Sequence, residues 1–199
     1  MRKGFGIAVA LMLPLAACGT DKAEQQVAKP AAGPRLTGLP PVVSANTALL
    51  ILGSFPGAAS LAAQQYYGHP QNHFWRILQA IWPSSQRPMV LDSYENRIQW
   101  LLDHGLGLWD VYASCERQGS LDTAIRNAEV NDFTALAARC PALRAIAHNG
   151  GESFRHARHS ARLGLPVHRL PSTSPANASW SFERKLAAWR DVFEQHGLI

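Results

Sequence analysis

The apolar run TALLILG, at residues 47–53, restricts the possible folds of this chain more than any other feature. Its central residues are apolar without alternation, and the run ends in a glycine. A strand with this pattern is buried on both faces, which is typical of a parallel sheet covered by helices on each side. Similar segments follow at residues 105–112, 143–151 and 165–171. The sequence therefore predicts a central sheet of four strands.

Segments with helical periodicity alternate with these strands. The segment 72–82 repeats apolar side chains on one helical face, at Phe74, Ile77, Leu78 and Ile81. Further helices are predicted at residues 92–105, 131–140, 151–164 and 180–197, the first of them starting with Asp92 and Glu95 in capping-box spacing. This alternation predicts an α/β protein, a single-domain three-layer α/β/α sandwich with a central four-stranded, mostly parallel sheet.

The size and composition of the chain agree with one globular domain. Its 199 residues can bury a full core but are few for two domains. Apolar residues make up 47% and charged residues 17%, which excludes a disordered chain. The net charge of +5 favours an anionic partner, although such an excess is also common on proteins that bind nothing acidic.

The three cysteines, Cys18, Cys115 and Cys140, are far apart in the sequence and form no CxxC or Cys/His cluster. We therefore expect no zinc site, no iron–sulfur cluster and no other metal or cofactor. A disulfide between Cys115 and Cys140 is an option only in an oxidising compartment.

The N-terminal segment points to export. Residues 1–18 combine two basic residues, a short apolar run and the ending LAAC, which resembles a bacterial lipobox with Cys18 as the lipidated residue. Residues 19–35 are rich in Ala, Gln and Pro, as in a flexible linker. The alternative is an upstream extension that is not translated, with the start near Arg35. The folded domain is expected to span residues 36–199.

Unusual chemistry is concentrated where the predicted strands end. The segments that follow them are GSFPG, WDVYASC, HNGG and LPSTSPAN. Because the carboxyl ends of parallel strands meet at one edge of a sheet, ligands of such folds bind there. This edge is therefore the expected functional site.

The first of these loops and the residues after it could form a pocket for a flat, polar ring. Its candidate residues are Gly53, Ser54, Phe55, Pro56, Gly57, Tyr67, His69 and Phe74, together with Asn149 from the third strand. Glycines allow close approach of the backbone, and Pro56 stiffens the turn. A plain tight turn explains the loop as well, and Asn72 could be only a helix N-cap. Neither GxGxxG nor GxxxxGKS is present, so a nucleotide-phosphate loop is not indicated.

The last loop suits contact with DNA. It supplies Ser172, Thr173, Ser174, Pro175 and Asn177, whose hydroxyl, amide and backbone groups could hold phosphates. The preceding segment 155–169 is basic and contains no acid, with Arg155, Arg158 and Arg162 near one helical face. An irregular connection and a solvated helix surface are the simpler explanations.

Together, GSFPG…YYGHPQNHFW and LPSTSPAN resemble the two signature segments of the uracil-DNA glycosylase superfamily, and LWDVYASCERQGSLD resembles its hypoxanthine-DNA (DNA-deoxyinosine) glycosylase branch. The resemblance runs from about Leu36 to the C-terminus. It implies a single α/β/α domain that flips a deaminated base out of DNA and hydrolyses its N-glycosidic bond in base excision repair. It also implies DNA as the partner, no metal or stable protein partner, and a monomer in the cytoplasm.

The resemblance implies roles for individual residues. Phe55 stands where related mismatch enzymes have a catalytic asparagine, and Leu170 where typical uracil enzymes have a catalytic histidine. The role of positioning water therefore passes to Asn72. Asp110, at the position of a base-reading asparagine, is the second candidate for the catalytic group. These departures favour hypoxanthine over uracil as the substrate.

Three alternatives stay open at this stage. The enzyme could prefer uracil in mismatches. The same fold could instead serve as a non-catalytic binding module of an envelope lipoprotein anchored through Cys18. A serine hydrolase is the weakest alternative, because GxSxG is absent and Ser54 has no identifiable base.

Overall fold

The computed structural model describes Met1 and residues 33–83 and 92–199. Residues Ala32–Ile199 fold as one unit. The predicted lipobox with Cys18, and most of the predicted linker, lie outside the described residues. In the described part of the chain, no helix has the length and apolar character needed to cross a bilayer.

The central sheet has the four predicted strands and is entirely parallel. Its strands are β2 (Leu49–Gly53), β3 (Leu106–Asp110), β6 (Ala145–Asn149) and β7 (Val167–Leu170). They are ordered β3-β2-β6-β7, so β2 and β6 lie at the centre. The predicted fold class is confirmed.

Helices cover one face of this sheet in a continuous core. Leu49 and Ile51 of β2 point into this core, which also contains side chains of α2 (Phe74–Ile81), α3 (Tyr94–Asp103) and α7 (Phe182–Gln195). Leu50 and Leu52 point to the opposite face. Every residue of β2 is buried, as the unbroken apolar run predicts.

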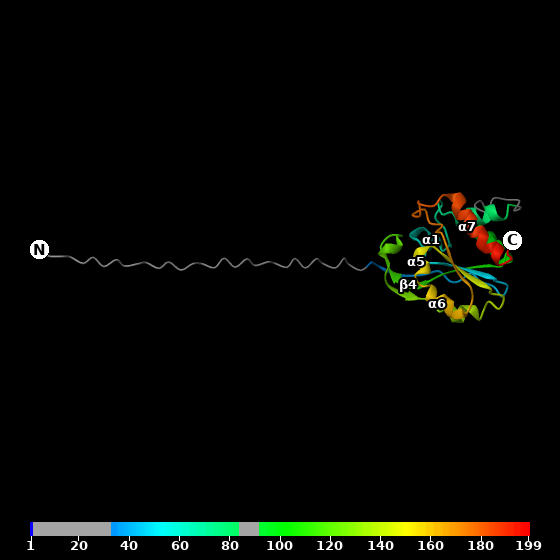
Figure 1. Cartoon of the computed structure of the whole chain (residues 1–199), viewed down its shortest axis with the longest axis horizontal. Coiled ribbons are helices and arrows are strands. Elements are labelled where there is room, and N and C mark those ends of the chain that lie inside the picture. The colour runs from blue at the N-terminus through cyan, green and yellow to red at the C-terminus, as the bar shows by residue number, and fades with distance from the viewer. Residues whose placement is uncertain (2–32, 84–91) are drawn as a thin grey trace. The chain divides into compact units, whose positions relative to one another are not determined.

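The opposite face carries short helices and a small second sheet. The helices are α4 (Phe133–Ala137), α5 (Gly151–Phe154) and α6 (Ala157–Ser160), followed by the 3₁₀ turn η3 (Ala161–Leu163). The second sheet is antiparallel, in the order β1-β4-β5, with β1 (Arg35–Thr37), β4 (Tyr112–Glu116) and β5 (Arg126–Val130). Figure 1 shows α7 and α6 on opposite sides of the central sheet.

The structure departs from the local expectations at several points. The predicted helix 151–164 is divided into α5, α6 and η3, and Ser153 and Ser160 of the first two both contact the buried His148. The cap of α3 is Ser93, which accepts the Asn96 N–H, and not Asp92. The six-residue helix α1 (Ala58–Ala63) and the second sheet were not predicted. Cys115 and Cys140 are both buried and free, so the disulfide that was left open is not formed.

His148, in the middle of the sheet, fastens the helices of the second face. The His148 ring is fully buried, with Nδ1 at 2.7 Å from Ser153 Oγ and Nε2 at 2.8 Å from Ser160 Oγ. Ser153 Oγ in turn donates to the Leu52 carbonyl at 2.8 Å. Burial lowers the pKa of His148 to about 4. The ring is therefore neutral in the folded protein.

This burial makes stability depend on pH. The unfolded chain protonates His148 near pH 6.5, whereas the folded protein resists protonation to about pH 4. We expect the free energy of unfolding to fall by about 3 kcal/mol from this group as pH drops from 6.5 to 4. Urea unfolding of the wild type and of His148→Gln at pH 7 and pH 5 checks this. An identical pH dependence in both proteins would contradict it.

Candidate active site

A cavity of about 610 Å³ opens at the carboxyl edge of the parallel sheet. Its lining comes from the first loop (Gly53, Ser54, Phe55, Pro56, Gly57), from the start of the following helices (Ala59, Ser60, Tyr66, Tyr67, His69, Asn72), from Asp110 and Asn149 at two strand ends, and from the segments 120–123 and 172–177. A volume of this size is typical of sites that enclose small molecules.

The predicted site residues are largely brought together. The whole first loop, Tyr67, His69, Asn72, Asp110 and Asn149 line the cavity, and so does the last loop. Phe74 does not, because its side chain is fully buried. Arg155, Arg158 and Arg162 are exposed and lie outside the lining.

The first loop is held against β3 by backbone hydrogen bonds. The Gly53 carbonyl accepts the Val111 N–H at 2.8 Å, and the Ser54 carbonyl accepts the Tyr112 N–H at 3.0 Å. A Cβ on Gly53 would collide with Asp110 Oδ1, so only glycine permits this approach. The N–H groups of Ser54 and Phe55 donate to no acceptor within the described residues. They are therefore free to bind a ligand.

Arg117 supports this loop from behind. Its guanidinium is 1% exposed, donates to the Pro56 carbonyl and lies 5.0 Å from the centroid of the Phe55 ring. Its Nε and Nη1 are buried without a partner in the described structure. Nothing in the sequence alone indicated that this arginine is buried.

Asp110 is a buried carboxyl group at the floor of the cavity. It is 5% exposed, and Oδ2 has no hydrogen-bond partner among the described residues. Burial, and next the negative charge of Asp122, raise the pKa of Asp110 to about 7, against a lowering influence of Tyr66 and Arg117. An unpaired buried oxygen of this kind is costly unless a ligand supplies the missing donor.

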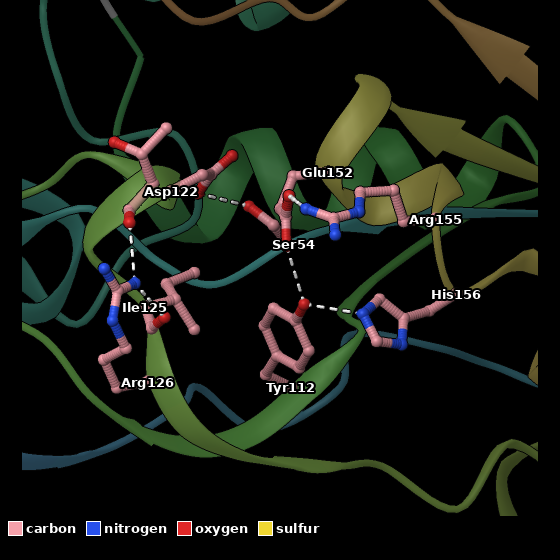
Figure 2. Close-up of polar contacts among 9 residues, drawn as sticks. Ser54, Tyr112, Asp122, Ile125, Arg126, Glu152, Arg155 and His156 are labelled. Atoms are coloured by element: carbon pink, nitrogen blue, oxygen red, sulfur yellow. Dashed lines mark hydrogen bonds and ion pairs between the residues drawn. The ribbon is translucent and has the colours of Figure 1, made fainter.

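The segment 120–123 completes one wall and was missed by the sequence reasoning. Asp122 Oδ1 accepts the Ser54 hydroxyl at 2.7 Å, and Ser120 Oγ accepts the Ala58 N–H at 2.9 Å. Figure 2 shows the Ser54 side chain directed at Asp122. Burial raises the pKa of Asp122 as well. The feature of the sequence that could have indicated this wall is RQGSLD, whose glycine and small polar residues predict an exposed turn.

A separate polar cluster lies beside this wall. The Tyr112 hydroxyl donates to Glu152 Oε1 at 2.8 Å and lies 2.7 Å from His156 Nε2, as Figure 2 shows. Tyr112 does not line the cavity. Glu152 also pairs with Arg155 at 3.1 Å. The argument that the basic segment has no acidic partner is therefore wrong for Arg155.

Two stacked rings form another wall. The Tyr67 and Phe74 rings have centroids 3.9 Å apart and planes inclined by 20°. Tyr67 lines the cavity, and its φ of 55° is in the left-handed region that residues other than glycine seldom occupy. Phe74, which was expected in the lining of the pocket, lies behind Tyr67 and supports its ring.

Asn72 lines the cavity just before α2. The N-cap of α2 is His73, so Asn72 is not the N-cap; its Oδ1 accepts the Phe74 N–H at 3.0 Å from one position further out. Because a donor faces that atom, it must be the oxygen, and this fixes the orientation of the amide. One lone pair of Oδ1 and the Nδ2 group have no partner in the described structure. Asn72 can therefore hold the turn that precedes α2 and still bind water.

The last loop is braced at its base and exposed at its tip. Trp189 Nε1 donates to the Pro171 carbonyl at 3.1 Å, and Lys185 Nζ donates to the Asn177 carbonyl at 3.0 Å. Within the loop, Asn177 Nδ2 donates to the Ser172 carbonyl at 3.0 Å. Pro175 at the tip is exposed. Such a rigid projection at the mouth of a cavity suits insertion into a DNA groove.

No group of three or more His, Cys, Asp or Glu side chains in residues 33–83 and 92–199 is arranged to hold a metal ion. The chemistry that the cavity can offer comes instead from a carboxyl group, an amide, free backbone N–H groups and an aromatic face. These groups suit a planar heterocycle with donors and acceptors on its edge.

The sequence is similar to proteins of known family. Residues 40–193 match the family described as the uracil DNA glycosylase superfamily. The chain is 37% identical over 158 residues to a hypoxanthine DNA glycosylase of Methanosarcina barkeri, covering 79% of this chain and 98% of the relative. It is 38% identical over 156 residues to a hypoxanthine DNA glycosylase of Methanosarcina acetivorans, covering 78% and 96%.

The fold has a solved counterpart. A solution NMR structure of a Methanosarcina acetivorans protein assigned as a uracil DNA glycosylase superimposes with a TM-score of 0.72 at 35% identity, covering 82% of this chain and 99% of that protein. The family match covers most of the chain, including every strand of the central sheet and the residues that line the cavity. This chain belongs to the uracil DNA glycosylase superfamily.

Proposed function

We propose that this protein is a DNA glycosylase that removes hypoxanthine from DNA by hydrolysis of the N-glycosidic bond and so starts base excision repair. The observation that carries the proposal is the cavity at the sheet edge, where an aromatic face, a buried carboxyl group and a free amide line one space of about 610 Å³. The two similar proteins from Methanosarcina are both named hypoxanthine DNA glycosylase, which supports the choice of base.

The target base must leave the duplex to enter this cavity. Flipping costs a few kcal/mol and costs least for a base that pairs poorly, as a deaminated base does. The exposed Pro175 and Ala176 are suitably placed to fill the gap left in the base stack. The Tyr67 ring, supported by Phe74, offers its face to the flipped base, which is worth about 1–3 kcal/mol.

The polar groups of the cavity suit the Watson–Crick edge of hypoxanthine. That edge presents a carbonyl oxygen at position six and an N1–H donor. The free N–H groups of Ser54 and Phe55 can donate to the carbonyl, and the Asp110 carboxyl group, which lines the cavity, can accept the N1–H. Adenine presents an amino donor and a bare N1, so both contacts would fail. Unpaired buried groups of this kind give strong discrimination.

Asn72 is the group proposed to position the attacking water. Cleavage of the N-glycosidic bond passes through an oxocarbenium-like transition state, as in glycoside hydrolysis. An amide is too weak a base to deprotonate water, so Asn72 acts by orientation, through the free lone pair of Oδ1. The negative charge on the departing base is stabilised by the loop N–H groups.

We further propose that the protein contacts DNA through residues 172–177 and through the exposed Arg155, Arg158 and Arg162, and that it works as a monomer. The net charge of +5 supports binding of a polyanion. We propose the cytoplasm as its location, because a DNA glycosylase needs access to the cellular DNA. Export through Cys18 is the alternative, and fatty-acid labelling of that cysteine would distinguish the two.

The direct test uses the full-length protein and duplexes that carry hypoxanthine, uracil or adenine, followed by alkaline cleavage of abasic sites. We expect strand breaks with hypoxanthine at a rate at least 100-fold above adenine, because a missing pair of hydrogen bonds is worth about 2–3 kcal/mol or more. Uracil is the informative competitor, because its edge also presents N–H beside a carbonyl. Faster cutting of uracil would replace hypoxanthine as the proposed substrate, and no cutting would end the proposal.

A further inference from the structure

We propose that Asn149 is a positioning residue that couples the DNA-contacting loop to the aromatic wall of the cavity, so that loop and ring move together during excision. This inference rests on the proposed function for its kinetic consequence, but the link itself is a property of the fold. It concerns three side chains far apart in the sequence: Tyr67, Asn149 and Thr173.

Asn149 is the last residue of β6 and lies between the two elements that it would join. Its Nδ2 donates to the Tyr67 hydroxyl at 3.1 Å and to Thr173 Oγ1 at 2.9 Å. Its Oδ1 accepts the Thr173 N–H at 2.9 Å. Three hydrogen bonds from one amide therefore connect the aromatic wall to the loop.

These bonds leave Asn149 little capacity for a base. A side-chain amide has two N–H groups, and both are already engaged by Tyr67 and Thr173. Only one lone pair of Oδ1 is free. Asn149 lines the cavity as expected, but to donate to a flipped base it would have to release the ring or the loop. Its hydrogen bonds suit holding neighbours in place.

The two partners of Asn149 differ in how firmly the protein holds them: Thr173 is anchored, whereas Tyr67 needs a further restraint. Thr173 is fully buried at the base of the loop, and its carbonyl accepts the His73 N–H at 3.0 Å. Tyr67 has the unusual backbone conformation with a φ of 55° and contacts the protein on one face through Phe74. A ring on a strained backbone needs a second restraint. The Asn149 N–H provides it.

The close approach of this strand end and the loop is built into the backbone. Gly150 has a φ of 110°, and a Cβ at that position would meet Ser172 Cβ at 2.9 Å. The Gly150 N–H donates to the Leu170 carbonyl at 3.0 Å. The loop thus leaves β7 directly beside Asn149. Any displacement of the loop would require Thr173 to carry the Asn149 amide with it or to break two hydrogen bonds.

The kinetic test is a double-mutant cycle on Tyr67→Phe and Thr173→Val, each of which removes one hydroxyl. The rate measured is that of single-turnover excision of hypoxanthine by the full-length protein. We expect each change to lower the rate about 3- to 10-fold, since a hydrogen bond is worth about 0.5–1.5 kcal/mol, with the Kd for the duplex changed less than 3-fold. The rate reduction in the double variant should be clearly smaller than the product of the two single reductions.

Two more variants sharpen this test. Asn149→Ala removes all three bonds, one more than the double variant, and should lower the rate at least as much. Thr173→Ser keeps the Oγ1 and should retain the wild-type rate. If the rate reductions of the two single variants simply multiply in the double variant, the proposed coupling is overturned. A variant that binds the duplex more weakly but excises at the wild-type rate would overturn it as well. If Asn149→Ala fails to fold, the cycle alone decides.

Hydrogen exchange tests the link without DNA or activity. Removal of the Tyr67 hydroxyl should speed exchange of the Thr173 amide at least 3-fold, because the amide group that holds it loses a restraint. Tyr112→Phe is the matched control, because it also removes a buried tyrosine hydroxyl but one bonded to Glu152 and His156. Equal exchange in both variants would overturn the link. A wild-type protein that cuts no duplex but passes this test would overturn the proposed function alone.

Discussion

Replacement of Asn72 by alanine should lower the single-turnover rate of hypoxanthine excision by about 10²- to 10³-fold, the usual effect of removing one preorganised polar group from an active site. The free lone pair of Asn72 Oδ1 is the acceptor that we propose for the attacking water. Binding of the duplex should change little, because the loop and the aromatic wall stay in place. Quenched-flow cleavage and fluorescence anisotropy with the same duplex measure the two quantities.

Alanine at position 72 also removes the oxygen that accepts the Phe74 N–H, which should reduce stability by about 1 kcal/mol. Asn72→Ser separates the two effects. The serine hydroxyl can accept the Phe74 N–H in place of the amide oxygen, so this variant should keep the free energy of unfolding while losing most of the rate. A serine variant that cuts at the wild-type rate would show that Asn72 serves only the helix.

The central sheet could be predicted because its signals are local. Each strand of the parallel sheet is a short apolar run followed by polar or glycine-rich residues, and parallel strands bring those residues to one edge. For that reason Gly53, Asp110 and Asn149 were expected at one site although they lie on three different strands, and the structure places all of them in the lining of the cavity.

The second sheet and the wall formed by residues 120–123 could not be predicted in the same way. The strand β4 starts two residues after β3 ends, so the sequence reads as one strand with a polar tail. Its partners are set by long-range pairing of β1 and β5, which no local pattern encodes. The hydrogen bond between Ser54 and Asp122 joins residues 68 positions apart.

The assignment of the aromatic wall shows the limit of periodicity. Helical spacing correctly places Phe74 on the buried face of α2. It says nothing about Tyr67, whose direction depends on a left-handed φ of 55° in the preceding turn. Both rings were therefore expected in the pocket, but only Tyr67 lines it.

The second large effect concerns Asp110, which should make the protein less stable and more active as pH rises. The pKa of this carboxyl group is about 7 in the folded protein, against 3.8 ordinarily. The folded state therefore binds the proton more tightly, so its contribution to stability is complete below pH 3.8 and is lost as pH rises through 7. The full difference corresponds to about 4 kcal/mol.

Asp110→Asn keeps the shape of the side chain and removes the charge. We expect this variant to be more stable than the wild type by about 3–4 kcal/mol at pH 8, with a gain that shrinks as pH falls and vanishes below about pH 4. Urea unfolding at pH 5 and pH 8 measures this. A variant that is less stable than the wild type at pH 8 would mean that the carboxylate is better compensated than its unpartnered Oδ2 indicates.

The excision rates of the wild type and of Asp110→Asn should differ in the opposite direction from their stabilities, with the wild type faster. Only the ionised carboxylate accepts the N1–H of hypoxanthine as a charge-assisted hydrogen bond, and the same ionised form is needed if Asp110 instead orients water. The wild-type rate should therefore rise between pH 6 and 8, whereas Asp110→Asn should be about 10- to 100-fold slower and independent of pH in that range. If Asp110 reads the base, Asp110→Asn should bind hypoxanthine DNA more weakly. If Asp110 orients water, only the single-turnover rate of this variant should fall. If stability rises while activity falls, the buried charge is kept for its function, at a cost to the fold.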